Sequence, residues 1–284
     1  MTTASGTTTA LDELRAEALA AGAKPRRFGA WYVTEQRIRS IRTYSGTVIA
    51  TAIGTPFLYL FAFGVGLATL VSANLGPEAV DGVSYLTFVA PALICSAAIT
   101  IAAEELTYPI MLGFKWNPIF IAMNAAPLSA PQIMNGVLIF VGLRMAAASA
   151  VYYLVMLAFG AISPGGALVI LIAVLTGFAF GAPLLAYSTS VTEDRGQFAI
   201  VMRVIVLPIT LFSGTIFPLS VLPVFLQWIG WISPLWHGTQ LAREVSYGTD
   251  EPFWLLIAHL VFLVALSVVG WRLSVRIARK RLDK

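Results

Sequence analysis

Long apolar segments recur along the chain, separated by shorter polar stretches. We place these segments at about 46–71, 84–106, 132–160, 167–190, 198–213 and 253–272. A helix rises about 1.5 Å per residue, so roughly 20 apolar residues cross the ~30 Å hydrocarbon core of a bilayer. The runs are continuous rather than alternating, which disfavours transmembrane β-strands. The pattern therefore predicts an all-α integral membrane protein with six transmembrane helices.

The chain before the first apolar segment has a different pattern. Residues 1–9 are mostly Thr, Ser, Ala and Gly with almost nothing to bury, so we expect them to be disordered. The sequence Thr9-Ala-Leu-Asp12 resembles a capping box and predicts a short helix that Gly22 and Pro25 would end. We assign residues 1–27 to a disordered cytoplasmic tail.

The transmembrane domain, residues 28–284, begins with an amphipathic segment. From Phe28 to Tyr44, apolar side chains such as Trp31 lie on one side of a helical projection and arginines such as Arg37 lie on others. This pattern predicts a helix that lies in the membrane surface.

Prolines interrupt the apolar stretch 198–236, which is too long for one span. It forms either two spans, or one span and a broken re-entrant segment. With six spans, the N-terminal arginines, Lys115, Arg195 and the basic C-terminal tail share one side, and only Arg243 lies on the other. A seventh span would place the basic tail outside, against the positive-inside rule. We therefore predict six spans, cytoplasmic termini and a re-entrant helical segment before the last span.

Composition supports a membrane location and gives no sign of catalysis. The 284 residues are 58% hydrophobic and 11% charged, against roughly 25% charged in soluble domains. The single cysteine, Cys95, permits no internal disulfide, and His237 and His259 stand too far apart in sequence to make a metal cluster by themselves. No lysine belongs to a phosphate-cradling Gly-x-x-x-x-Gly-Lys-Ser/Thr loop, so we expect no ATP hydrolysis, metal or cofactor in this chain.

Two neighbouring segments carry a resemblance to a known family. Residues 211–227 read LFSGTIFPLSVLPVFLQ, and residues 233–243 read SPLWHGTQLAR. This block resembles the signature of type-2 ABC exporter permeases, with the nearest likeness to the branch that exports lipooligosaccharide nodulation factors and to related drug exporters. Weaker matches at 57–66, 84–91, 105–109 and 126–129 extend the resemblance over about residues 30–275.

The resemblance implies a fold and a mechanism. Members are six-helix subunits that dimerise with an identical or paralogous permease and bind two copies of a separate ATPase, which holds ATP and Mg. They move amphipathic substrates outward. The motif residues of the re-entrant segment are then Gly214, Phe217, Pro218, Pro223, Pro234, Trp236 and His237. We expect His237 to anchor this loop by hydrogen bonds rather than to carry a proton.

The longest cytoplasmic loop, residues 107–131, contains a mostly apolar helix bracketed by prolines. The resemblance makes this helix the lever that the ATPase pushes; the alternative is that it packs only on its own subunit or on lipid headgroups. The candidate coupling residues are Glu105, Lys115, Trp116, Asn117, Pro127 and Leu128. Glu104 and Glu105 are either solvated or paired, with the amphipathic helix or with the ATPase.

The substrate pathway has four candidate residues: Phe57, Tyr59, Phe61 and Arg144. The aromatic side chains either line an apolar route or face lipid and core. Counting from Gln132 at the inner surface, Arg144 lies ~18 Å along its span, where a charge must be paired or in contact with water. It either forms a structural ion pair or serves the pathway, and the sequence does not name its partner.

Two other functions compete with an exporter permease. A secondary transporter would need coupling-ion carboxylates at mid-membrane, whereas Glu104 and Glu105 lie near a span end. A membrane-embedded lipid-modifying enzyme would need an acid/base cluster at one interface, and no His or Asp accompanies these two acids in their loop.

Overall fold

The computed structural model describes residues 4–76 and 80–283. Apart from one isolated bridge, the secondary structure of this part of the chain is helical. The first half consists of α1 (Ala4–Ile41), η1 (Arg42–Tyr44), α2 (Ser45–Tyr59), η2 (Leu60–Leu67), α3 (Ala68–Leu75), α4 (Tyr85–Glu105), α5 (Tyr108–Met111), η3 (Leu112–Trp116), α6 (Ile119–Ala125) and α7 (Ala130–Ala158). The second half consists of η4 (Pro164–Leu168), α8 (Val169–Ser190), α9 (Gln197–Ile200), η5 (Val201–Val206), α10 (Leu207–Phe212), η6 (Leu219–Val221), α11 (Val224–Ile232), α12 (Pro234–Tyr247) and α13 (Phe253–Leu282).

The predicted all-α membrane fold is confirmed. Within the described residues, five helical stretches are long and apolar enough to cross a membrane: Ser45–Val71, Tyr85–Trp116, Ala130–Ala158, Pro164–Ser190 and Phe253–Leu282. A shorter apolar stretch, Gln197–Phe212, coincides with the predicted fifth span. Each predicted apolar segment therefore corresponds to a helical stretch.

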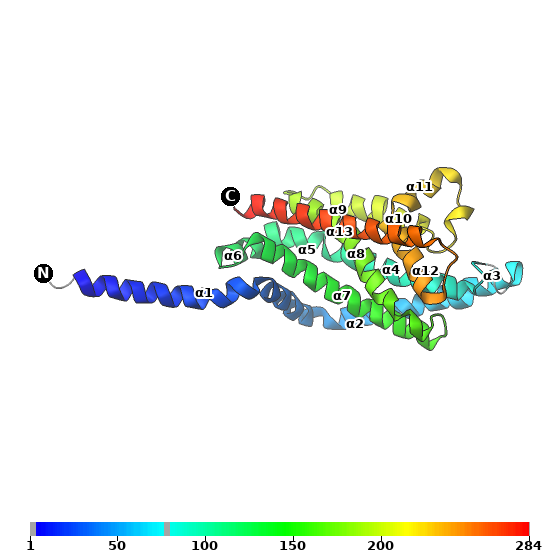
Figure 1. The fold of residues 1–284 in the computed structure, drawn as a ribbon, viewed down its shortest axis with the longest axis horizontal. Helices are drawn as coiled ribbons and strands as arrows, with labels where there is room; N and C mark the ends of the chain where they lie inside the picture. The colour runs from blue at the N-terminus through cyan, green and yellow to red at the C-terminus, as the bar shows by residue number, and fades with distance from the viewer. Residues whose placement is uncertain (1–3, 77–79, 284) are drawn as a thin grey trace.

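Helices α4, α7 and α8 form the centre of the bundle, and α13 packs along α8 (Figure 1). Small residues permit close helix contact: a Cβ atom at Gly181 would lie 2.8 Å from Leu106 and 3.0 Å from Ala102 of α4. By contrast, only 12% of the most apolar 18-residue part of Ser45–Val71 is buried inside the subunit, against 67% of the corresponding part of Tyr85–Trp116. The first span therefore lies on the outside of the subunit.

The two ends of the bundle differ in what they carry. Both chain termini and α6 lie at one end, and α3 and α11 lie toward the other (Figure 1). We call the first the basic end, because the C-terminal cluster of Arg279, Lys280 and Arg281 belongs to it. The fold thus has the arrangement of termini that the six-span prediction requires.

The N-terminus differs from the prediction. Helix α1 begins at Ala4 and continues past Gly22 and Pro25, where a helix end was expected; it bends at Phe28, which has non-helical backbone angles. Residues 4–27 are therefore helical in the structure, and Met1 to Thr3 of the predicted disordered tail lie outside the described residues. Many strong helix formers between positions 10 and 20, chiefly Ala, Leu, Glu and Arg, account for the difference.

The chain between α10 and α13 turns back within one end of the bundle. The short helices η6, α11 and α12 occupy this segment, and α12 packs against α4, α8 and α13. At nine residues, α11 is about 13 Å long, too short to cross the hydrocarbon core. The structure therefore contains the short re-entrant helices that the prolines predicted.

Candidate coupling site at the basic end

Four charged side chains meet where α4 ends. The Arg144 guanidinium, from α7, forms an ion pair with Glu105 and lies 3.7 Å from a Glu104 oxygen. Arg37, from α1, lies 3.6 Å from the other Glu105 oxygen. The Glu105 side chain is only 9% exposed, and those of Arg37 and Arg144 are 11% and 18% exposed. Mutual pairing reduces the cost of removing these charges from water.

This charge cluster bears on two alternatives that the sequence left open. Glu105 is paired rather than solvated, and one of its partners belongs to the predicted amphipathic helix. Arg144 has a structural ion pair, with partners 39 and 40 positions earlier in the chain. The cluster ties α1, α4 and α7 together at the basic end.

The proline-bracketed loop forms the predicted helix, α6, between Pro118 and Pro127. Its Phe120 side chain is buried and packs edge-on against Phe114 at 5.0 Å. On its other side the loop exposes apolar surface: Trp116 is 52% exposed and Ile121 is 54% exposed. The loop therefore presents both a packed face and an open one.

Three contacts hold α6 and its flanking residues in place. Arg37 lies over the Phe120 ring at 5.7 Å while it pairs with Glu105. Asn124 donates a hydrogen bond to the Leu282 carbonyl at 3.1 Å, which connects α6 to the end of α13. Gln132 donates to the Arg26 carbonyl at 2.5 Å, which connects the start of α7 to α1.

Leu128 differs from the other predicted coupling residues in its surroundings. A Cβ atom at Gly29 would lie 2.8 Å from the Leu128 side chain, so Leu128 packs closely on α1. Beside it, an open depression of about 420 Å³ is lined by Arg26, Ala126, Pro127, Leu128, Ser129 and Gln132. Lys115, Trp116 and Asn117 are exposed. The structure thus divides the candidate set into an exposed part and a part packed against α1.

The predicted motif of the re-entrant segment is organised by a buried arginine. Arg243, which is 3% exposed, donates to the carbonyl oxygens of Gly214 at 2.8 Å and Phe88 at 3.3 Å. Tyr85 donates to the Ile216 carbonyl at 2.9 Å. These bonds attach the loop that contains Phe217 and Pro218 to α4. The sequence showed Arg243 only as the one basic residue on its side, and its structural role was missed.

The remaining motif residues start the short helices of the segment. Pro223 precedes the first residue of α11, and Pro234 is the first residue of α12. Proline is favoured there because the first turn needs no N–H bond and its φ is already helical. The Trp236 ring packs edge-on against His237 and His259 at 4.9 and 5.0 Å. The two histidines, far apart in sequence, are therefore neighbours in the fold.

The predicted pathway residues do not form one cluster. Phe57, Tyr59 and Phe61 are 37%, 43% and 59% exposed, and Phe57 packs edge-on against Phe159 at 6.1 Å. Arg144 lies fifteen positions before Phe159, ~22 Å away along a helix. A pathway role for these residues stays a prediction.

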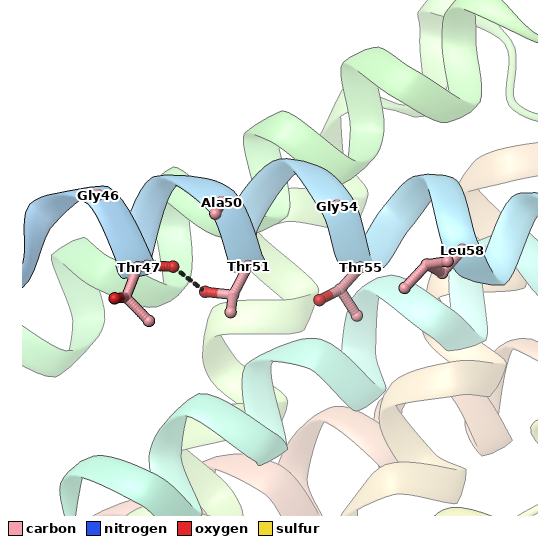
Figure 2. Close-up of a pocket in the computed structure, with 7 residues that line it drawn as sticks. All are labelled: Gly46, Thr47, Ala50, Thr51, Gly54, Thr55 and Leu58. Atoms are coloured by element: carbon pink, nitrogen blue, oxygen red, sulfur yellow. Dashed lines mark hydrogen bonds between the residues drawn. The ribbon is translucent and has the colours of Figure 1, made fainter.

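A shallow groove runs along α2 (Figure 2). Its volume is about 460 Å³, and its lining residues are Gly46, Thr47, Ala50, Thr51, Gly54, Thr55 and Leu58. The Thr51 hydroxyl donates to the Thr47 carbonyl at 2.9 Å, so this polar group is satisfied within the helix. The groove therefore presents mostly small residues to its surroundings, three of them threonines.

Comparison with known proteins decides the family. The family model described as "ABC-2 type transporter" matches residues 30–247. The chain belongs to this family. It is therefore a multi-pass membrane component of a transporter, with the permease fold that its signature block predicted.

Similar proteins carry the name Nodulation protein J. The proteins of Rhizobium leguminosarum bv. viciae and bv. trifolii are 27% and 28% identical over 248 residues, which cover 86% of this chain and 92% and 91% of the relatives. The Bradyrhizobium diazoefficiens protein is 24% identical over 250 residues, with 86% and 91% coverage. These relatives match this ABC-2 permease over nearly their whole length.

Proposed function

We propose that this chain is the permease subunit of an ATP-driven ABC exporter that moves an amphipathic substrate outward. The substrate classes that fit are a lipid-linked glycan, a lipooligosaccharide or a hydrophobic drug. The resemblance of the signature block to exporter permeases supports this direction and substrate class, and the similar proteins are named for nodulation. ATP and Mg bind to a separate ATPase, and this chain contributes no cofactor.

The exposed face of α6 and its flanks is the observation that carries the proposal. Trp116 and Ile121 expose more than half of their side-chain surface at the end that also carries the basic tail. The positive charge of this end supports a cytoplasmic location for it. Exposed apolar surface of this kind marks an interaction site, so we assign it to the ATPase.

The packed face of the same loop gives a route for movement. Phe120 lies under Arg37, and Arg37 pairs with Glu105, which pairs with Arg144. A displacement of α6 therefore acts on α1, α4 and α7 through contacts, rather than on one span alone. The bond from Asn124 to the end of α13 extends the connection to the last span.

The assembly follows from the same proposal. Two copies of the ATPase bind two permease subunits, identical or paralogous, in the plasma membrane with both permease termini in the cytoplasm. Opening and closing at the interface of the two permeases moves the substrate outward. The charge asymmetry between the two ends of the bundle supports this orientation.

Neither competing function gains support from the site. A secondary transporter needs carboxylates free to bind a coupling ion, whereas Glu105 is buried between two arginines. A lipid-modifying enzyme needs an acid or base free to exchange protons with substrate, and the same pairing opposes that role.

Recovery of the ATPase with the permease tests the proposal. The chain should be co-expressed with an ATPase encoded by a neighbouring reading frame and isolated through a tag on the permease. Trp116→Ala should reduce the recovered ATPase. Trp254→Ala is the matched control, because Trp254 is 68% exposed at the opposite end of the bundle. Equal recovery with both variants would remove the α6 surface from the docking site.

A further inference from the structure

The two histidines of the chain form a buried pair between α12 and α13. The Nδ1 atoms of His237 and His259 lie 2.6 Å apart. His259 is fully buried. The Phe262 ring stacks on the His237 imidazole at 4.0 Å, and Trp236 packs edge-on against both imidazoles. Aromatic side chains therefore enclose the contact between the two rings.

The outer nitrogens of the pair also have polar partners. The Nε2 atom of His237 lies 3.0 Å from the Trp231 carbonyl oxygen. The Nε2 atom of His259 lies 3.2 Å from a Glu251 carboxylate oxygen. The second Glu251 oxygen accepts a hydrogen bond from Gln240. A continuous row of three contacts thus runs from Glu251 through both imidazoles to a backbone carbonyl.

The row of contacts requires one more proton than two neutral imidazoles and an ionised Glu251 supply. Each of the three contacts needs one hydrogen, and the Trp231 carbonyl can only accept. Two neutral imidazoles bring two hydrogens, and an ionised Glu251 brings none. The third hydrogen must sit on Glu251 or make one imidazole doubly protonated. This count holds for every choice of tautomer.

Charged groups on α12 and on the loop before α13 surround the row. Arg243 donates to the Gln240 oxygen at 3.1 Å, and Gln240 in turn donates to Glu251. Glu244 is turned away, because it accepts both hydrogen bonds of Thr249. Asp250 is exposed. The nearest fixed charge in the network is therefore the Arg243 guanidinium.

The other neighbouring elements add few titratable groups. Helix α11 contains none, and the upper part of α4 contributes Tyr85 and the thiol of Cys95. Burial raises the pKa of Tyr247, beside Asp81, above its usual range, so this phenol stays neutral. The α8 sequence contains no Asp, Glu, Lys, Arg or His, and α13 has no further charged residue before Arg272.

We propose that Glu251, His259 and His237 form a proton-binding site that joins the re-entrant helix α12 to the last span. One proton taken from solvent completes all three hydrogen bonds without breaking a covalent bond. Without it, two lone pairs face each other at one contact. The site goes beyond an anchor for the loop, because its occupancy fixes how tightly α12 is tied to α13.

Burial disfavours His237 as the carrier of the added proton. Desolvation lowers the pKa of the His237 imidazole to about 4, which disfavours a doubly protonated His237. When the proton sits on Glu251, every member of the row is neutral. Glu251 then donates to His259, His259 donates to His237, and His237 donates to the Trp231 carbonyl. Proton binding on Glu251 therefore sets the tautomers of both imidazoles.

Nitrogen NMR of the full chain tests the site directly. The sequence contains two histidines, so ¹⁵N-histidine labelling reports on this site alone if the purification tag contains no histidine. We expect the ring-nitrogen shifts of His237 and His259 to change together, with one shared midpoint, between about pH 4 and 9. Two separate midpoints, or no change in either ring, would overturn the proposal without any variant.

Two substitutions sharpen the result. Glu251→Gln should abolish the shared step or move its midpoint, because the amide cannot take up the proton. Glu244→Gln is the matched control, since this residue lies in the same segment but contacts Thr249 instead of the histidines. If the shared midpoint is the same in the Glu251→Gln and Glu244→Gln variants, the Glu251 carboxylate is not part of the site.

Discussion

The Glu105→Gln substitution should destabilise the chain by more than the loss of one surface charge pair. Glu105 lies between Arg37 and Arg144, and its side chain is only 9% exposed. The substitution removes the carboxylate that pairs with both arginines, while Glu104 stays beside Arg144. Breaking a buried ion pair from one side costs ~3–5 kcal/mol. Because Glu104 stays 3.7 Å from Arg144, we expect a loss at the lower end of this range, about 3 kcal/mol.

The matched control is Glu35→Gln. Glu35 pairs with Arg39 at 2.5 Å, but these side chains are 37% and 72% exposed. Exposed pairs contribute about 0–1 kcal/mol, so this variant should unfold close to the wild type. Unfolding of both purified variants in one detergent, by heat and by added SDS, gives the comparison. If Glu105→Gln unfolds within about 0.5 kcal/mol of Glu35→Gln, which is the size expected of surface substitutions, the cluster does not hold α1, α4 and α7 together.

Three further predictions concern topology, coupling and the re-entrant segment. In a Cys95→Ala background, a single cysteine at Arg279 should resist membrane-impermeant labelling from outside intact cells, and labelling there would contradict cytoplasmic termini. Trp116→Ala should leave the protein inserted while export falls several-fold relative to ATP hydrolysis by the complex; unchanged coupling would contradict the role of α6. Arg243→Met should lower stability by about 1–3 kcal/mol for each carbonyl left unsatisfied, measured by detergent unfolding; a wild-type midpoint would show that the Gly214 and Phe88 bonds contribute little.

The spans and helix α6 could be predicted from the sequence because their signals are local. Each span is a continuous apolar run, and the asymmetric basic charges choose between six and seven spans. Pro118 and Pro127 mark the limits of α6, and Pro223 and Pro234 mark the starts of two short helices. Such features depend on hydrophobic length and backbone geometry, which neighbouring residues determine.

The charge and histidine clusters could not be predicted because their members are distant in sequence. Arg37, Glu105 and Arg144 meet only after three helices have packed, and no local pattern records that contact. His237 and His259 are 22 positions apart and become partners through the packing of α12 on α13. The continuation of the N-terminal helix past Gly22 was missed for a different reason, since Gly22 and Pro25 suggested an end that the surrounding helix formers override.

Transport by reconstituted protein tests the central claim most directly. The chain should be placed in proteoliposomes with and without the neighbouring ATPase, and transfer of a fluorescent amphipathic lipid should be measured after ATP addition. The account predicts ATP-dependent transfer only when both proteins are present, and no ATP hydrolysis by the purified chain alone. ATP hydrolysis by the chain free of any ATPase, or equal transfer without the ATPase, would contradict a permease that receives its energy from another subunit.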